Sequence, residues 1–553
     1  MATSLRPTAT QPSNLFAAID MGTSSFKLLI VQFNSSTGKF TPIDRYKEPV
    51  ALGRDTSSTS TPPTISPSSR RRALETLSRF QKPIKSRNIM QTRCVATSAV
   101  REATNRDDFL QEVSEKLNLQ VNVLSGIEEA KLIYLGVLQF LPIFARRVLV
   151  VDIGGGSTEF VIGLRGKAIY AISLKLGHVT LTQQFHEDLV GMRHYIRSQI
   201  EESGLIENVR NLEFEIAVGS SGTVRAIEKV LCLNYGVGEV MNPVSGEVSR
   251  DWRFSRKELM DVFERLCGGG EEERVRRNQF FGRRSEFIVA GAVLLEEIFE
   301  LLGINEMQVS GYGLGEGVVV EMIYGFCDDY DVNANLRWPS VVRLSTRFNG
   351  KNRMKFASRT AAISKEIFEG VRKSNEVAVD LNAIRICLNE KDLEYLEAAC
   401  LLHNIGLCLG KKGYHKQSYN IIMKGDHLDG YTAEEIKLIA LLARHHRKKF
   451  PRLDDTSLQE ISQEVKLRFI MLCSILRISI IIQQYQSPEM YNIEFSQSCE
   501  GFKLVLKEIK DQPPVSSSEE CMAEITSKVL SEELKRFEEV FHQKLAVVAH
   551  KSL

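Results

Sequence analysis

Two stretches of this 553-residue chain place an aspartate, glycines and hydroxyl side chains at spacings that suit a phosphate group. In the clearer one, Asp152 ends an apolar run, and three glycines, a serine and a threonine follow from Gly154. The apolar runs on both sides predict strand, turn and strand. Turn glycines let backbone N–H groups approach phosphate oxygens, and a carboxylate at a strand end can hold hydrated Mg²⁺. An isolated copy fits a plain tight hairpin equally well.

A looser copy lies near the start of the chain. There Asp20 and Gly22 occupy the places that Asp152 and Gly154 hold in the first copy. Such self-similarity indicates two related halves. If the two hairpins face one another across a cleft, they place two aspartates and two sets of turn amides around one phosphate group.

The order of several motifs resembles the exopolyphosphatase/guanosine pentaphosphate phosphatase family, in the superfamily that contains actin, hexokinase and the heat-shock ATPases. These motifs are D-M-G-T-S-S-F-K-L from Asp20, A-T-S-A-V-R-E-A-T-N from Ala96, S-G-I-E-E-A-K-L-I-Y-L-G from Ser125, D-I-G-G-G-S-T-E from Asp152, L-G-H-V-T-L-T from Leu176 and G-S-S-G-T-V-R-A from Gly219. The resemblance covers nearly the whole chain, because it continues through L-L-H-N-I-G-L from Leu401 and R-H-H-R-K from Arg444.

The resemblance implies roles for three charged residues. Glu129 matches the family's catalytic glutamate, which positions or deprotonates the attacking water, and Glu159 matches a second glutamate of the catalytic centre. Arg101 matches an arginine that reaches the phosphate, for which a guanidinium is well shaped. Ser125 and Glu128 have capping-box spacing, which leaves Glu129 free to face the cleft. The alternatives are that Arg101 is an ordinary surface arginine and that Glu129 is a first-turn acid that complements the helix dipole.

A metal ion is expected because a carboxylate beside a phosphate is repelled unless a cation lies between them. We predict Mg²⁺, or Mn²⁺, on Asp152, with Glu159 and, through water, Asp20. The predicted phosphate-binding residues lie in the two aspartate-tipped turns and in a third turn that resembles another phosphate-facing loop of the family: Gly22, Thr23, Ser24, Ser25, Gly154, Gly155, Gly156, Ser157, Thr158, Ser221, Gly222 and Thr223.

The predicted fold class is α/β, with two actin-like (ribonuclease H-like) domains around a cleft, then an all-α domain and a small α/β tail. We expect long helices after about Asp331 with no strand before about Asn492, and a tail helix from Ser518 to Lys544. The expected boundaries are a disordered N-terminus at 1–14, actin-like domain I at 15–141, actin-like domain II at 142–331, a helical His-Asp-like domain at 332–485 and the tail at 486–553.

Two charged segments have open interpretations. Arg70, Arg71 and Arg72 precede a predicted helix from Ala73 to Phe80, where they either meet a polyanion or form a solvated helix face. The glycine and charge blocks from Gly268 to Arg284 are typical of an exposed insertion.

The helical domain resembles the metal-dependent His-Asp phosphohydrolases. Asn404 replaces a metal-binding aspartate, and the helix from Phe356 to Glu369 lacks the first histidine ligand, so we do not expect a working second metal centre. An electrostatic role is favoured instead, in which cations steer a phosphate chain, with a solvated helix face as the alternative. The residues concerned are Lys411, Lys412, His415, Lys416, Arg444, His446, Arg447, Lys448 and Lys449.

Composition fits a large enzyme. Lys plus Arg total 71 against 69 for Asp plus Glu, so attraction for a polyanion has to come from local clusters. The ten cysteines include no C-x-x-C pair, which favours a reducing, cytoplasmic compartment. The longest apolar run, around Phe469 to Ile482, is interrupted by Arg477 and is shorter than the roughly 20 residues of a membrane span.

The predicted function is release of terminal phosphate from inorganic polyphosphate or guanosine pentaphosphate. The expected partners are that substrate and, by resemblance, a second copy in a homodimer, with no membrane and no specific nucleic acid. Two rival functions remain: a small-molecule kinase of the same superfamily, and a non-catalytic sensor of polyphosphate or a guanosine alarmone. The sequence does not choose between long-chain polyphosphate, a short oligophosphate and a guanosine pentaphosphate.

Overall fold

The chain divides into two compact units, Met1–Pro339 and Ser340–Leu553, in a computed structural model. The expected disordered N-terminus lies almost wholly outside the described residues. Those residues are 14–55, 63–87, 89–232, 253–268, 271–327, 330–333, 335–373, 379–381, 384–424, 427–453, 455, 458–459, 461–485, 491–498, 501–508, 521–524 and 528–551.

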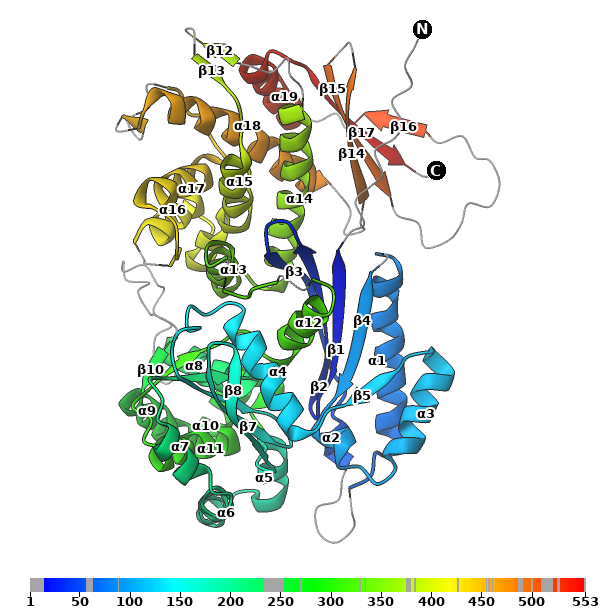
Figure 1. Cartoon of the computed structure of the whole chain (residues 1–553), viewed down its shortest axis with the longest axis vertical. Coiled ribbons are helices and arrows are strands. Elements are labelled where there is room, and N and C mark those ends of the chain that lie inside the picture. Colours follow the sequence, from blue (N-terminus) through cyan, green and yellow to red (C-terminus); the bar gives the residue numbers. More distant parts are fainter. Residues whose placement is uncertain are drawn as a thin grey trace. The chain divides into compact units, whose positions relative to one another are not determined.

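The first sheet of the first unit has five strands in the order β3-β2-β1-β4-β5 (Figure 1). β1, β2 and β3 are antiparallel, whereas β4 and β5 run parallel to β1. Leu77 and Phe109 of two covering helices pack with Phe26 of the sheet in one hydrophobic cluster. The elements are β1 (Leu15–Met21), β2 (Ser25–Asn34), β3 (Lys39–Pro49), η1 (Leu52–Asp55), α1 (Pro67–Lys85), β4 (Gln91–Ala96), α2 (Ser98–Arg101), α3 (Arg106–Leu117) and β5 (Val121–Val123).

The second sheet repeats this plan, with the order β10-β11-β9-β6-β7-β8. β6, β7 and β8 are antiparallel and β9 and β11 run parallel to β6, so β6 is the counterpart of β1. The predicted internal repeat is therefore present in the strand topology. The elements are β6 (Val148–Ile153), β7 (Thr158–Leu164), β8 (Lys167–Leu174), α5 (His178–Phe185), α6 (Leu189–Glu202), α7 (Leu205–Leu212), β9 (Ile216–Ser220), α8 (Gly222–Cys232), β10 (Arg253–Ser255), α9 (Arg256–Cys267), α10 (Glu271–Phe281), η2 (Gly282–Arg284), α11 (Ile288–Leu301) and β11 (Glu306–Val309).

Two helices pack between the sheets: α4 (Gly126–Leu138) contacts β7 and β8, and α12 (Leu314–Tyr324) contacts β1 and β2 (Figure 1). Their backbones cross so closely that a Cβ on Gly317 would overlap the carbonyl group of Leu132. Glycine is required at this crossing because it has no side chain. The crossing fixes α4, whose first turn carries Glu129, against both halves.

The second unit is helical, with a small α/β tail. α13 (Arg337–Phe348) spans the division between the units. The tail sheet has the order β14-β15-β17-β16, and a buried ion pair between Arg477 and Glu533 joins α18 to α19, with Nε–Oε2 at 2.9 Å. The elements are α14 (Lys351–Lys373), β12 (Val379–Leu381), β13 (Ile384–Ile386), α15 (Glu390–Leu402), η3 (Ile405–Leu409), α16 (Tyr414–Lys424), α17 (Ala433–His445), α18 (Gln463–Tyr485), β14 (Tyr491–Ser498), β15 (Gly501–Glu508), β16 (Cys521–Glu524), α19 (Lys528–Phe541) and β17 (Leu545–Lys551).

The fold class is confirmed: two actin-like α/β halves, a helical region and a small α/β tail. Two element predictions are wrong. β12 and β13 form a hairpin before Asn492, because two short strands are too brief to interrupt a helical pattern in the sequence. The predicted tail helix is instead β16 followed by α19, because residues 521–524 pair with β17, a partner that local sequence does not reveal.

The triple arginine lies inside α1, which begins at Pro67 behind the N-cap Ser66, not at Ala73. Arg72 donates to the carbonyl of Val50 at 2.9 Å, and Arg70 and Arg71 pair with glutamates. The three guanidinium groups thus have structural partners. In the part of the chain that the structure describes, no helix is both long and apolar enough to cross a membrane.

Candidate active site

The two aspartate-tipped turns, after β1 and after β6, meet at one junction. A Cβ built on Gly155 would lie 2.8 Å from Ser24 Oγ, and one on Gly156 would lie 2.6 Å from Ser98 Oγ and 3.2 Å from Thr23 Oγ1. Any larger residue would push the turns apart. The hydroxyl of Ser24 is buried and has no hydrogen-bond partner, so this junction contains an unused donor.

Asp20 and Asp152 end their strands at this junction. Asp20 is 4% exposed and accepts a hydrogen bond from Lys27 Nζ at 2.8 Å. Burial raises the pKa of Asp152 and the charge of Asp20 raises it further, against a hydrogen bond from Ser220 and the charge of Lys27. The two carboxylates therefore act on one another across the junction, as the facing hairpins predict.

Glu129 projects from the first turn of α4 and is 6% exposed. Burial raises its pKa to about 7, and the charges of Asp20 and Asp152 add to this rise, while Arg101 opposes it. Arg101 donates through Nη1 to Glu129 Oε2 at 2.8 Å and to the Leu124 carbonyl at 3.0 Å. Glu129 is thus held by Arg101 and lies within reach of the charges of both aspartates.

The neighbouring Glu128 has the expected structural role. Its backbone N–H donates to Ser125 Oγ at 3.2 Å, and its carboxylate accepts from the Ser125 backbone N–H at 2.8 Å. This capping box fixes the start of α4 and leaves Glu129 as the glutamate directed at the junction.

Glu159 is 2% exposed on β7 and accepts a hydrogen bond from Ser173 Oγ at 2.8 Å. Burial raises the pKa of Glu159 well above its ordinary value, and the charges of Glu129 and Asp152 raise it further. A carboxylate held in this environment either keeps a proton or requires a cation.

The strand registers expose a difference between the two hairpins. In the first, Asp20 on β1 lies directly opposite Lys27 on β2. In the second, Asp152 on β6 lies directly opposite Glu159 on β7. The sequence analysis did not identify Lys27 as a site residue. The lysine lies within the first motif, but the local sequence does not reveal its cross-strand pairing with Asp20.

The phosphate-binding residues predicted in the two aspartate-tipped turns divide into two groups. Thr158 is fully buried, and its hydroxyl donates a hydrogen bond to the Leu176 carbonyl. Its role is therefore to stabilise the turn. The others line the turns themselves and lie beside the aspartates: Gly22, Thr23, Ser24, Ser25, Gly154, Gly155, Gly156 and Ser157.

The third small-residue turn, Ser221 to Thr223, begins α8 beside β6. Ser221 has a φ of 108°, a strained conformation for a residue with a side chain, and its Oγ accepts from the Thr223 N–H at 3.2 Å. Such strain is often found at functional sites. Arg284 donates to the Gly222 carbonyl, so the segment expected to be an insertion reaches this turn: α10 is exposed, as predicted, but Arg284 is half-buried.

Cations that the sequence did not single out lie next to these turns. Lys47 on β3 is the cross-strand partner of Lys27. Desolvation, together with the positive charges of Arg284, Lys27 and Arg225, lowers the pKa of Lys47 to about 8. No carboxylate pairs with Lys47, Arg225 or Arg284 among the described residues. Like charges placed together in this way favour an anion between them.

The junction also suits a divalent cation. Asp20, Glu129, Asp152 and Glu159 are four buried or half-buried carboxylates, and Lys27 and Arg101 are the cations that contact them. Two negative charges remain uncompensated when all four are ionised, and the charges of Glu129 and Asp152 add to the rise that burial causes in the pKa of Glu159. Magnesium usually binds through one or two carboxylates together with substrate phosphates, which matches this ligand set.

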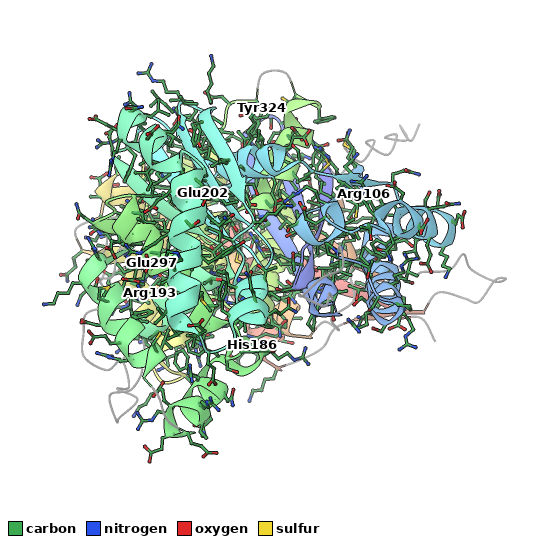
Figure 2. The ribbon with its side chains drawn as sticks, turned by 90° about the horizontal axis from the view of Figure 1, so that it is seen from below. Arg106, His186, Arg193, Glu202, Glu297 and Tyr324 are labelled. Atoms are coloured by element: carbon green, nitrogen blue, oxygen red, sulfur yellow. The ribbon has the colours of Figure 1, made fainter. Side chains whose placement is uncertain are left out.

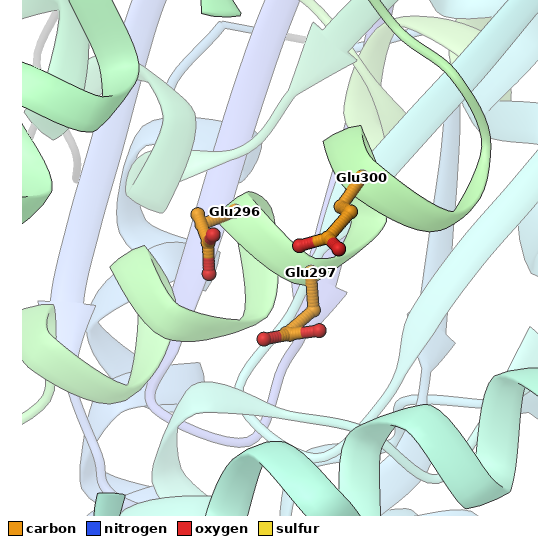
Figure 3. Close-up of side chains that lie close together, drawn as sticks. All are labelled: Glu296, Glu297 and Glu300. Atoms are coloured by element: carbon orange, nitrogen blue, oxygen red, sulfur yellow. The ribbon is translucent and has the colours of Figure 1, made fainter.

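Another acidic cluster does not suit a metal. Among the described residues, Glu296, Glu297 and Glu300 alone form a group of three or more ligating side chains whose atoms lie within 4.8 Å of one another (Figure 3). Arg197 pairs with Glu297 at 2.6 Å and with Glu300 at 2.9 Å. Arg193 pairs with Glu296 and with Glu297, and Figure 2 labels Arg193 and Glu297. The two arginines of α6 therefore pair with all three carboxylates and offset two of their three charges.

The comparisons with known proteins identify the family. Residues 30–325 match the model of the Ppx/GppA phosphatase family, and residues 336–513 match domain III of the Ppx/GppA phosphatases. The chain belongs to the Ppx/GppA phosphatase family. The predicted family and the hydrolase class are thereby confirmed, whereas the likeness of the helical region to His-Asp phosphohydrolases stays a prediction.

Three relatives illustrate the similarity. A guanosine-5'-triphosphate,3'-diphosphate pyrophosphatase of Vibrio parahaemolyticus is 29% identical over 502 residues, which cover 89% of this chain and 92% of that protein. An exopolyphosphatase from Cytophaga hutchinsonii is 25% identical, with a TM-score of 0.49 over 58% of this chain and 100% of that chain. The Aquifex aeolicus member of the Ppx/GppA family is 26% identical, with a TM-score of 0.46 over 57% and 99% of the two chains.

Proposed function

We propose that the protein hydrolyses the terminal phosphoanhydride bond of inorganic polyphosphate or guanosine pentaphosphate. Glu129 carries the proposal: it is buried at the junction, beside two aspartate-tipped turns, with a pKa raised to about 7. A general base works best when its pKa lies near the operating pH.

The turns and the cations bind the substrate in this proposal. Turn N–H groups and the unpartnered hydroxyl of Ser24 donate to the terminal phosphate. Arg101 uses Nη1 for Glu129 and Leu124, which leaves Nη2 for an equatorial phosphate oxygen. Lys47, Arg225 and Arg284 hold the phosphates that follow the terminal one.

The chemical step is an in-line displacement by water. Glu129 accepts a proton from the water molecule while the water oxygen attacks the terminal phosphorus. A new P–O bond forms, the bond from phosphorus to the bridging oxygen breaks, and the departing phosphate keeps the electron pair. Arg101 and the turn amides stabilise the charge on the equatorial oxygens, and loss of one such group typically costs on the order of 10²- to 10³-fold in rate.

Asp152 and Glu159 would hold the Mg²⁺ or Mn²⁺ ion, with Asp20 acting through water because Lys27 already occupies its Oδ2. When bound, the ion neutralises charge on the terminal phosphoryl group. The excess of buried carboxylates at the junction supports this assignment.

The test is phosphate release by Glu129→Gln and by its matched control, Glu128→Gln. Both changes remove one charge from the same helix turn, but Glu128 serves the N-cap. We expect Glu129→Gln to lose turnover by more than about 100-fold and Glu128→Gln to keep it. The substrates are long-chain polyphosphate, tripolyphosphate and guanosine pentaphosphate, with and without Mg²⁺. Equal activity of the two variants would refute the role of Glu129.

The same assay separates the rival functions. A kinase requires an acceptor hydroxyl. Phosphate release to water with no acceptor present would therefore exclude the kinase function. A sensor binds these substrates without releasing phosphate at all. Binding without turnover by the wild-type protein would therefore favour the non-catalytic function.

We further propose a cytoplasmic homodimer. Seven described cysteines are free thiols, which suits a reducing compartment. Mass measurement in solution tests the dimer.

A further inference from the structure

The short helix α5 begins directly beside the turn after β6. The N–H of its first residue, His178, donates to the Gly154 carbonyl at 3.1 Å, and the next two N–H groups donate to the Gly155 carbonyl at 3.0 and 3.3 Å. These peptides are trans, so each N–H points opposite to the C=O of the same peptide. The N–H groups of Gly155 and Gly156 therefore point away from α5, and the helix fixes their orientation.

Two further contacts hold the start of α5. A Cβ on Gly177, which precedes the helix, would lie 2.1 Å from the Gly155 carbonyl oxygen, so only glycine allows this approach. His178 Nδ1 lies 3.2 Å from Thr223 Oγ1 in the third small-residue turn. The N-terminus of α5 is thus attached both to the turn after β6 and to the third turn.

Farther along, α5 is connected to the turn after β1 through the segment that contains η1. Gln183 donates through Nε2 to the Gly53 carbonyl at 3.1 Å. This segment in turn holds the turn after β1 by two backbone hydrogen bonds. The N–H of Ala51 donates to the Ser24 carbonyl at 3.1 Å. The N–H of Gly53 donates to the Thr23 carbonyl at 3.3 Å.

The segment around η1 is closely packed and strained. A Cβ on Gly53 would lie 2.6 Å from Thr23 Cγ2. Ala51 has a φ of 52°, a conformation that residues with a side chain rarely adopt. Such a conformation persists only where the surrounding contacts hold it, and the hydrogen bond from Gln183 is one of these contacts. A change at Gln183 should therefore alter the position of the turn after β1.

We propose that Gln183 is a positioning residue that sets the distance between the turn after β1 and the turn after β6. Through Gly53 it fixes the hydroxyl of Ser24 relative to the amides of Gly155 and Gly156. This role rests on the proposed hydrolysis, in which the terminal phosphate contacts both turns at once. The spacing matters because a misplacement of about 1 Å can cost on the order of 10²-fold in rate.

The kinetic test compares Gln183→Glu with its matched control, Gln184→Glu. Glutamate keeps the size of glutamine, but its carboxylate has no N–H to donate to the Gly53 carbonyl. Gln184 is the exposed neighbour, so the control adds the same charge to the same helix. We expect Gln183→Glu to lower kcat at least about tenfold and to change KM less than about threefold, because the other two turns still bind the substrate. Gln184→Glu should keep both parameters within about twofold of the wild type.

A double-mutant cycle with Ser24→Ala separates positioning from general destabilisation. If Gln183 acts by placing Ser24, the loss caused by Gln183→Glu should shrink to less than about threefold when residue 24 is already alanine. A structural defect would lower kcat by the same factor in both backgrounds. Equal factors, an equal loss in Gln184→Glu, or an unchanged kcat in Gln183→Glu would each overturn the proposal.

Hydrogen exchange of the free proteins gives a readout that does not require turnover. The peptide containing Ala51 and Gly53 should exchange at least about threefold faster in Gln183→Glu than in Gln184→Glu, because its contact with α5 is lost. Unchanged exchange would contradict the positioning role whatever the turnover. If the wild-type protein releases no phosphate but exchange differs, the proposed hydrolysis fails and the contact stands. If Gln183→Glu does not fold, Gln183→Met removes the donor without adding a charge, with Gln184→Met as its control.

Discussion

The β1–β2 and β6–β7 hairpins have the same topology and the same register but opposite charge at one position. Lys27 faces Asp20 in the first hairpin, and Glu159 faces Asp152 in the second. The first hairpin therefore contains its own cation, held 2.8 Å from the aspartate. The second has a half-buried and a buried carboxylate directly opposite one another, so any added cation belongs there.

Among the changes that test this comparison, Glu159→Gln should have the largest effect on turnover. The change removes one of the two charges that would hold the cation, and we expect turnover to fall on the order of 10²-fold and the Mg²⁺ concentration for half-maximal activity to rise. Glutamine resembles the protonated acid that the raised pKa favours, so the fold should persist. The measurement is phosphate release against Mg²⁺ concentration. An unchanged Mg²⁺ dependence would contradict the assignment of the cation to the second hairpin.

Lys27→Met should lower the Mg²⁺ concentration for half-maximal activity, whereas Glu159→Gln should raise it. Loss of the ammonium leaves Asp20 and Asp152 more negative, so Mg²⁺ should act at a lower concentration. The substrate, an anion, should bind less well, with KM raised about tenfold. Lys167→Met, on the exposed start of β8, is the control. If both variants shift Mg²⁺ dependence in the same direction, the contrast between the hairpins is not the cause.

The smallest effect is on stability. Because the pKa of Glu129 is raised from 4.5 to about 7, its contribution to stability is present below pH 4.5 and is lost as pH rises through 7. Glu129→Gln should therefore be more stable than the wild type at pH 8, by on the order of 1–3 kcal/mol, and nearly equal to it at pH 5. Urea unfolding in EDTA at the two pH values measures this. A difference that does not depend on pH would show that Glu129 ionises normally.

Much of the fold and the outline of the active site could be predicted because their signals are local. Asp20 and Asp152 each end an apolar strand and precede glycines. The capping box formed by Ser125 and Glu128 assigns Glu128 to the helix N-terminus and leaves Glu129 for the site. Lys47 and Arg284 could not be found in this way. Their relevance depends on a cross-strand partner and on contact with Gly222, which lies 62 residues away.

The sequence by itself determined the repeated hairpins, the glycine turns and the identity of the acidic residues, because residue type and spacing fix strands, turns and caps locally. The tertiary structure decided the electrostatics. Whether a carboxylate keeps its proton, pairs with a lysine or requires a metal depends on its burial and its nearest charges. These neighbours come from segments far apart in the chain, so no local pattern specifies them.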